Sequence, residues 1–166
     1  RDTVEFWVDE TVMADLIVAP QSWLQGKQAG QASRALPGAW RSTLSAIDGI
    51  AAVDTYRDVY VDVAGQPVAL VSRDLRLHAQ RSRYLMVHGD SSAALRRAAE
   101  NGGALLSEVL ASRLGLREGD KVSITTPAGP TAVPVEGIFY DYATDGGKMV
   151  MDRTWYQRQW HDDRVT

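Results

Sequence analysis

Alternating hydrophobic and polar positions along the chain predict two β-hairpins. Residues 51–63 place apolar side chains between aspartates and arginines, and residues 65–67 then turn the chain into an apolar run. Residues 121–126 alternate in the same way before a Pro-Gly turn. Pro134 lies inside the returning strand, which predicts an edge strand or a bulge there. The predicted strands span residues 16–19, 51–63, 68–71, 104–106, 121–126, 131–139 and 148–151.

Helical periodicity and capping signals predict the helices. Ser107 and Asp152 are placed to cap the start of a helix, and Gly115 is placed to end one. Tyr156 and Trp160 stand one turn apart on the last helix, where they are expected to stack. The predicted helices begin with an opening helix from Thr3 and continue at residues 39–47, 91–100, 108–114 and 153–160.

The first forty residues carry three further predictions. Trp7 on the opening helix and Trp40 on the next helix lie on apolar faces and are expected in the core. The apolar run at residues 16–19 reads as a short buried strand, because Pro20 stops it. Residues 25–38 carry Gly, Gln and Ser without periodicity, which predicts a mobile loop.

This mixture of helices and antiparallel hairpins predicts the α+β class. The pattern changes near Arg83 and again near Gly137. We therefore expect a larger α/β layer from residues 1–83 and 138–166, with a small helix-and-barrel unit inserted at residues 84–137.

Composition excludes several classes of function. The chain has 166 residues, a net charge of -3 and no cysteine. A basic nucleic-acid footprint, a disulfide framework, a thiolate metal site and a cysteine nucleophile are therefore all absent from the sequence. No run of 18 apolar residues occurs in it. Because the chain opens at Arg1 without a methionine, we expect it to be a segment of a longer protein.

The sequence holds no phosphate-binding, dinucleotide-binding, zinc-protease or serine-hydrolase motif. Two short runs, His88-Gly-Asp90 and His161-Asp-Asp163, could each offer an imidazole and carboxylates to zinc. No second ligand cluster accompanies either run, so an exposed loop and a frayed helix end are favoured. The third histidine, His78, lies in a basic stretch. Accordingly, no catalytic, cofactor-binding or metal-binding residue is predicted.

Three other polar features have structural explanations that we favour. Asp141 and Asp145 precede two glycines, but they lack the spacing of a calcium loop. Ser107 and Glu108 resemble a nucleophile with an acid, although helix capping accounts for both. The arginines of residues 73–83 could hold phosphate, but the acidic opening of the chain offers them opposite charge.

The last helix predicts a contact with another protein part. Trp155, Tyr156 and Trp160 crowd a short terminal helix, where not all of the aromatic surface can be buried. Packing onto the body of the molecule is the alternative for these side chains.

An ordered series of segments resembles a known family. The series consists of the run at residues 103–130, the strand from Val133 with its Gly-Ile-Phe-Tyr-Asp-Tyr end, residues 147–153, and Tyr156 with Trp160. Together these segments resemble the extracytoplasmic domain of FtsX-like, MacB-type ABC transporter permeases. The opening residues 7–19 resemble the segment that leaves the preceding membrane helix in that family.

The resemblance implies a porter-like layer with a smaller inserted subdomain, called Sabre in MacB, and no active site or cofactor. It implies an ABC ATPase partner on the cytoplasmic side, flanking membrane helices, and either a second permease copy or a periplasmic adaptor. The expected location is the periplasmic or extracellular side of the bacterial inner membrane. The expected activity is export or extraction of lipoproteins, peptides or drugs, including lipoprotein release, or activation of an envelope partner. A further strand, helix and strand are expected after Thr166, without which the layer has an unpaired edge.

Two other interpretations remain open. The turn at residues 114–122 with its hairpin also resembles small barrels in soluble enzymes. A free-standing binding module of the cell envelope fits the same pattern. About 20 apolar residues upstream of Arg1 would favour the permease.

Overall fold

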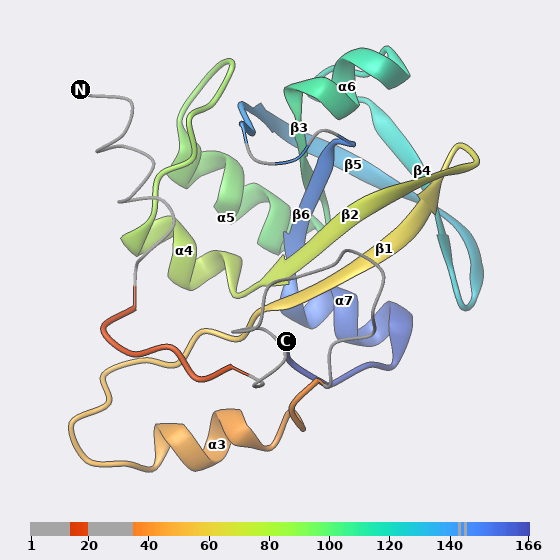
Figure 1. Cartoon of the computed structure of the whole chain (residues 1–166). Coiled ribbons are helices and arrows are strands. Elements are labelled where there is room, and N and C mark those ends of the chain that lie inside the picture. The colour runs from red at the N-terminus through yellow and green to blue at the C-terminus, as the bar shows by residue number, and fades with distance from the viewer. Residues whose placement is uncertain (1–13, 20–34, 143, 145) are drawn as a thin grey trace.

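One mixed β-sheet with helices on both sides forms the body of the molecule (Figure 1). The computed structural model describes residues 14–19, 35–142, 144 and 146–166. The opening helix from Thr3, Trp7 and most of the predicted loop at 25–38 lie outside these residues. The elements are α3 (Trp40–Ser45), β1 (Arg57–Val63), β2 (Gln66–Arg73), α4 (Leu75–Arg81), α5 (Ser91–Asn101), β3 (Ala104–Ser107), α6 (Glu108–Leu114), β4 (Lys121–Thr126), β5 (Gly129–Phe139), β6 (Lys148–Asp152) and α7 (Arg153–Trp160).

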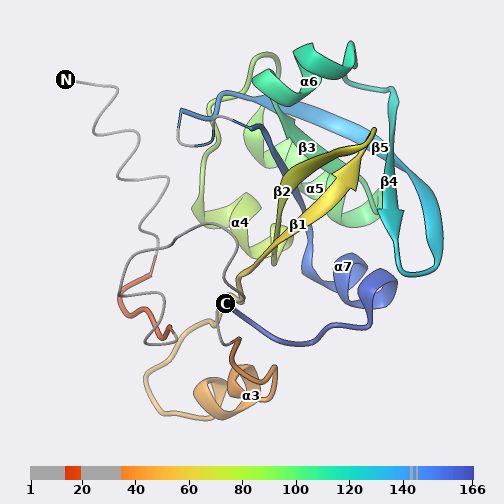
Figure 2. The ribbon, with the colours of Figure 1, turned by 45° about the vertical axis from the view of Figure 1, so that its right-hand side comes forward.

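The six strands follow the order β1-β2-β6-β3-β5-β4. The β2–β6 and β3–β5 pairs are parallel, and the other three pairs are antiparallel. The sheet curls so strongly that its two edge strands, β1 and β4, contact each other (Figure 2). This curl closes one face of the sheet around a core and confirms the predicted α+β class.

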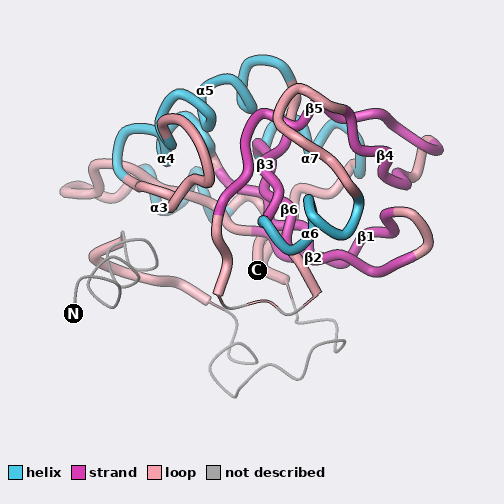
Figure 3. The backbone as a smooth tube through the Cα atoms, turned by 90° about the horizontal axis from the view of Figure 1, so that it is seen from above, coloured by secondary structure: helices cyan, strands magenta, loops and turns pink. Residues whose placement is uncertain are grey.

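The central strands are buried on both faces. On β3, Leu106 points into the core inside the curl, whereas Leu105 points into a second core beneath α4 and α5. Helices α4 and α5 lie side by side along one flank of the strands, and α6 lies on the other (Figure 3). Since successive strand residues point to opposite faces, a short apolar strand such as β3 can serve both cores.

Most of the predicted elements are confirmed. Ser107 caps α6 by accepting a hydrogen bond from the amide of Leu110, and Gly115 ends the helix in the left-handed conformation. The strand that contains Pro134 lies inside the sheet, so the edge alternative is wrong. The strand does contain a register shift, but it lies two residues beyond Pro134, because Ala104 pairs with Val135 and Leu105 with Gly137.

Two predictions about the first half of the chain are wrong, and one helix was missed. Residues 14–19 form neither helix nor strand, and Leu16 is 70% exposed where a buried strand was expected. Trp40 is 42% exposed, and α3 has no buried residue, although its apolar periodicity predicted a core helix. Helix α4 was not predicted, because the arginines among its residues masked the pattern of its buried face, which consists of Leu75, His78 and Ala79.

The two predicted units share the single sheet. Strand β3, from the predicted insert, lies between β6 and β5, and β4 belongs to the same sheet as β1. The boundaries at residues 83/84 and 137/138 therefore do not separate two sheets. The assignment of porter-like and Sabre-like subdomains to these ranges stays a prediction.

Candidate functional site

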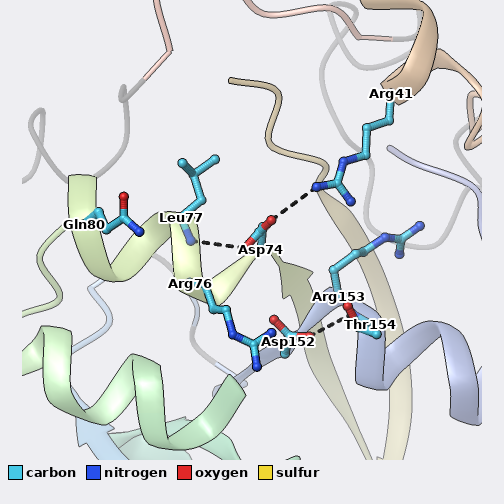
Figure 4. Close-up of a pocket in the computed structure, with 8 residues that line it drawn as sticks. All are labelled: Arg41, Asp74, Arg76, Leu77, Gln80, Asp152, Arg153 and Thr154. Atoms are coloured by element: carbon cyan, nitrogen blue, oxygen red, sulfur yellow. Dashed lines mark hydrogen bonds and ion pairs between the residues drawn. The ribbon is translucent and has the colours of Figure 1, made fainter. Parts of the chain in front are cut away.

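A polar groove lies where β2 and β6 end (Figure 4). These strands are parallel neighbours, and Arg73 at the end of β2 pairs with Asp152 at the end of β6. Each strand runs directly into a helix, β2 into α4 and β6 into α7. The carboxyl ends of parallel strands are a common place for functional sites in sheets with helices on both faces.

Two aspartates organise this groove. Asp74 caps α4 by accepting from the amide of Leu77 at 3.1 Å, and its other oxygen lies 3.3 Å from Arg41 of α3. Asp152 accepts from the amide of Thr154 in α7 at 2.9 Å and from the amide of Leu75 in α4 at 3.3 Å. Asp152 thereby joins the starts of both helices.

The groove has two adjoining parts, of about 340 and 310 Å³, which share Arg76, Asp152 and Thr154. Positive and negative side chains line both parts, so neither presents a field of a single sign. The first part is lined by Arg41, Asp74, Arg76, Leu77, Gln80, Asp152, Arg153 and Thr154.

A partly buried acid–imidazole pair joins α4 to the segment before β1. Nε2 of His78 on α4 lies 2.7 Å from Oδ2 of Asp54, which belongs to the segment that leads from α3 to β1. The other oxygen of Asp54 accepts from the amide of Asp74 at 3.2 Å. Burial by itself raises the pKa of Asp54, but His78 and Arg73 beside it bring that pKa below its ordinary value.

Beside this pair, the guanidinium of Arg73 lies 5.0 Å from the centre of the Tyr56 ring. Burial, followed by the nearby charge of Asp58, raises the pKa of Tyr56 far above its ordinary range. Tyr56 is therefore un-ionised at any physiological pH.

The Asp54–His78 pair does not have the setting of a catalytic dyad. Ser82 lies one helical turn beyond His78, and together the three residues have the composition of a Ser-His-Asp triad. However, His78 is 2% exposed, Ser82 is 4% exposed, and neither lines the groove. A substrate could not reach them, so the pair acts as a structural hydrogen bond between α4 and the segment before β1.

A second polar network holds the end of the chain. Arg57 Nε lies 3.0 Å from Asp162 Oδ2, which also accepts from the hydroxyl of Tyr156 at 3.0 Å. The guanidinium of Arg153 donates to Ser72 and to the carbonyl groups of Asp163 and Arg164. These bonds tie residues 162–166 to the start of β1 and to the groove.

The predicted aromatic contact is only partly available on the surface. Tyr156 is 1% exposed, so its side chain is not available on the surface for the predicted contact. Its ring stacks on Trp160 as expected, with 4.9 Å between the ring centres. Trp155 and Trp160 are half-buried and pack against the core inside the curl. A contact between these two tryptophans and another protein part stays a prediction.

The other candidate residues are not brought together into one site. His88 lies in an exposed turn, and His161 ends α7 in the left-handed conformation. Asp141 forms an ion pair with Lys148 at 3.1 Å, and Ser107 caps α6. Within residues 14–19, 35–142, 144 and 146–166, no group of three or more His, Asp or Glu side chains could hold a metal ion.

The arginines of residues 73–83 do not form one phosphate cluster. Arg73 packs inward on Tyr56, whereas Arg76 lines the groove and Arg81 is exposed at the end of α4. Most of the acidic opening expected to face them lies outside the described residues.

Sequence reasoning missed the groove and the Asp54–His78 pair. One signal could have indicated α4, because Asp74 precedes apolar positions at Leu75, His78 and Ala79, the spacing of a capped helix. No sequence signal places Asp54 beside His78, since the two are 24 residues apart.

Comparisons with known proteins complete the description. The chain is 28% identical over 169 aligned residues to the uncharacterized ABC transporter permease protein Rv0987 of Mycobacterium tuberculosis. The match covers 100% of this chain but 19% of that protein, so the chain corresponds to a fraction of the relative's length. No protein-family model matches the sequence.

Two solved structures are similar. The extracellular domain of the noncanonic ABC-type transporter YknZ from Gram-positive bacteria matches with a TM-score of 0.53 and 10% identity, over 79% of this chain and 70% of that chain. The periplasmic region of MacB from Actinobacillus actinomycetemcomitans matches with a TM-score of 0.49 and 12% identity, over 84% of this chain and 67% of that chain. At 10% identity, the likeness to YknZ concerns the fold alone.

The fold and the sequence similarity define a class: the chain is similar to the extracytoplasmic domains of ABC transporter permeases. The resemblance to ABC transporter permeases that the sequence indicated is confirmed by the M. tuberculosis relative. In the part of the chain that the structure describes, no helix is both long enough and apolar enough to cross a membrane.

Proposed function

We propose that this chain is the extracytoplasmic domain of an ABC transporter permease and that it transmits movement without chemistry of its own. The observation that carries the proposal is the similarity to the M. tuberculosis permease protein over the whole chain. The fold shared with the extracellular domain of YknZ supports a location outside the cytoplasm.

In this proposal a cytoplasmic ATPase subunit drives the membrane helices, and those helices displace the domain. A second permease copy or a periplasmic adaptor is the proposed partner on the outer side. The proposed cargo is a lipoprotein, a peptide or a drug, or the movement activates an envelope partner. The sheet suits this role because its central strands are packed on both faces, and closely packed interiors transmit strain.

The location can be tested in the full-length permease, because this chain has no cysteine of its own. Thr125 is exposed on β4, and Val122 is buried on the same strand. Each of them is replaced by cysteine in turn. In intact cells whose outer barrier is permeabilised, a membrane-impermeant maleimide should label Thr125→Cys and spare Val122→Cys. Labelling of Thr125→Cys only after the inner membrane is broken would refute the proposed location.

The role in coupling can be tested by replacing residues 1–166 with a flexible Gly-Ser linker in the permease–ATPase complex. A flexible linker transmits little force. We therefore expect ATP hydrolysis in proteoliposomes to continue while transport, or activation of the envelope partner, is lost. Unchanged transport would show that this domain is not part of the coupling route, and would favour a free-standing binding role.

A further inference from the structure

The segment of residues 35–56, called the α3 segment below, is attached to the sheet mainly by polar contacts. Helix α3 has no buried residue, and Thr55 is the one residue of this segment classed as buried. Trp40 and Ile47 are both largely exposed. Tyr56, at the end of the segment, packs against the core beneath α4 and α5. Before Tyr56 apolar packing contributes little, so the position of α3 depends on hydrogen bonds and ion pairs.

Three of these polar contacts are made with α4 and its capping residue Asp74. Asp54 binds both the imidazole of His78 and the amide of Asp74, as described above. Arg41 lies 3.3 Å from Asp74. Three backbone hydrogen bonds join the segment to the end of the chain: Leu36 exchanges two with Val165, and the amide of Thr166 donates to the carbonyl of Tyr56.

The two side-chain contacts, Arg41–Asp74 and Asp54–His78, differ in their surroundings. The side chain of Arg41 is 52% exposed, and exposed pairs of this kind contribute little to stability. The side chain of His78 is 3% exposed, so loss of Asp54 would leave a buried imidazole without its carboxylate. Its Nδ1 already has no hydrogen-bond partner among the described residues. The Asp54–His78 pair is therefore the stronger of the two attachments.

His78 also connects this attachment to the interior. Its neighbours on α4, Leu75 and Ala79, belong to the core beneath α4 and α5, together with Leu105 of β3 and Val150 of β6. A displacement of Asp54 would act on His78, then on the packed face of α4, and then on the central strands.

We propose that the Asp54–His78 pair is the latch through which movement of the α3 segment passes to α4 and the sheet, an inference that rests on the proposed role in transmitting movement. With the latch closed, the α3 segment and the sheet move as one body. With the latch broken, the α3 segment moves while the sheet keeps its fold.

The test measures a distance distribution within the 166-residue chain, so it does not depend on transport. Spin labels at Ala46→Cys, beside α3, and at Thr125→Cys, on β4, report the position of the segment relative to the sheet by pulsed electron paramagnetic resonance. We expect Asp54→Asn to broaden this distribution by about twofold or more, as local opening without global unfolding does. Asp48→Asn, at an exposed position on the same segment, is the matched control and should leave it unchanged.

Two variants of His78 keep the test decisive if Asp54→Asn does not fold. His78→Gln retains a side-chain N–H that can reach Asp54 and should keep the narrow distribution, whereas His78→Leu should broaden it. An unchanged distribution in a folded Asp54→Asn protein would overturn the proposal. Equal loss of the whole fold in Asp54→Asn and in both His78 variants would also overturn it, because the pair would then be part of the global core. If Asp54→Asn broadens the distribution as expected but transport is unchanged after linker replacement, the proposed function is rejected and the latch is not.

Discussion

At the scale of single residues, several positions combine a special backbone conformation with a close neighbour. Gly147 adopts φ 82°, and a Cβ atom added to it would lie 2.8 Å from Cβ of Leu110, which is fully buried in α6. This glycine lets the loop before β6 pass directly over α6. Gly146, its neighbour in sequence, has nothing within 4 Å of the corresponding position.

We predict that Gly147→Ala destabilises the fold by about 2–4 kcal/mol, because backbone strain adds to overpacking against Leu110. Gly146→Ala is the matched control and should change the free energy of unfolding by about 0.5 kcal/mol or less. Urea denaturation of both variants checks this. Equal stability of the two variants would show that the loop moves away from α6 at little cost.

Asp162 gives the fold a dependence on acid pH. Burial raises the pKa of this carboxyl, but the hydrogen bonds from Arg164, Arg57 and Tyr156 outweigh burial and hold the pKa far below its ordinary value. Because the folded-state pKa lies below the unfolded-state value, the stabilisation is fully present near neutral pH. It is lost as pH falls below about 4 toward the folded-state value.

We therefore predict that Asp162→Asn lowers stability at pH 7 and flattens the fall in stability between about pH 4 and pH 2. Urea midpoints measured across this range for both proteins provide the check. A variant whose acid profile runs parallel to that of the parent would show that other carboxylates dominate acid unfolding.

At the scale of elements, the helix starts are determined by single polar side chains. Asp90 caps α5 from an exposed position with one hydrogen bond to the amide of Ala93. Asp152 is 4% exposed and serves two helices, through the amides of Thr154 and Leu75. Loss of a cap that joins two helices should therefore lower the free energy of unfolding more than loss of a cap that serves one helix.

We expect Asp152→Ala to cost about 2–4 kcal/mol, since it leaves the buried amide of Leu75 and the helix-start amide of Thr154 without their partner. Asp90→Ala should cost about 1 kcal/mol, the usual value for one exposed cap. Thermal and urea unfolding of the two variants should reproduce this order. The reverse order would mean that water replaces Asp152 in the groove.

The elements also explain what could be predicted from the sequence. Hairpins and capped helices depend on neighbours a few residues away, so β4, α6 and α7 were predicted correctly. The exposure of α3 could not be predicted, because periodicity shows that a helix face is apolar but does not show whether another element covers that face. The Asp54–His78 and Arg57–Asp162 pairs join residues 24 and 105 positions apart, and only the folded sheet brings them together.

At the scale of the whole molecule, the curled sheet joins both halves of the chain in one structure. Strand β3 lies between β6 and β5, and its Leu106 is fully buried in the core inside the curl. That core contains residues from all six strands. Removing any one strand would therefore expose apolar surface contributed by both predicted units.

We predict that residues 84–137 and the rest of the described sheet unfold together in a single cooperative transition, because every strand contributes to the shared core. Leu106→Ala should cost about 3–5 kcal/mol and should lower the protection of the amides of β2 and of β5 equally. Native-state hydrogen exchange, resolved to individual strands, measures both quantities. Val109 is exposed on α6, so Val109→Ala is the control and should change neither the free energy of unfolding nor the amide protection by more than about 0.5 kcal/mol.

If β4 and β5 instead exchange at a lower free energy than β1 and β2, and Leu106→Ala affects only one set, then the inserted unit opens independently. The domain would then transmit movement by a hinge between two units, not by displacement of one rigid sheet.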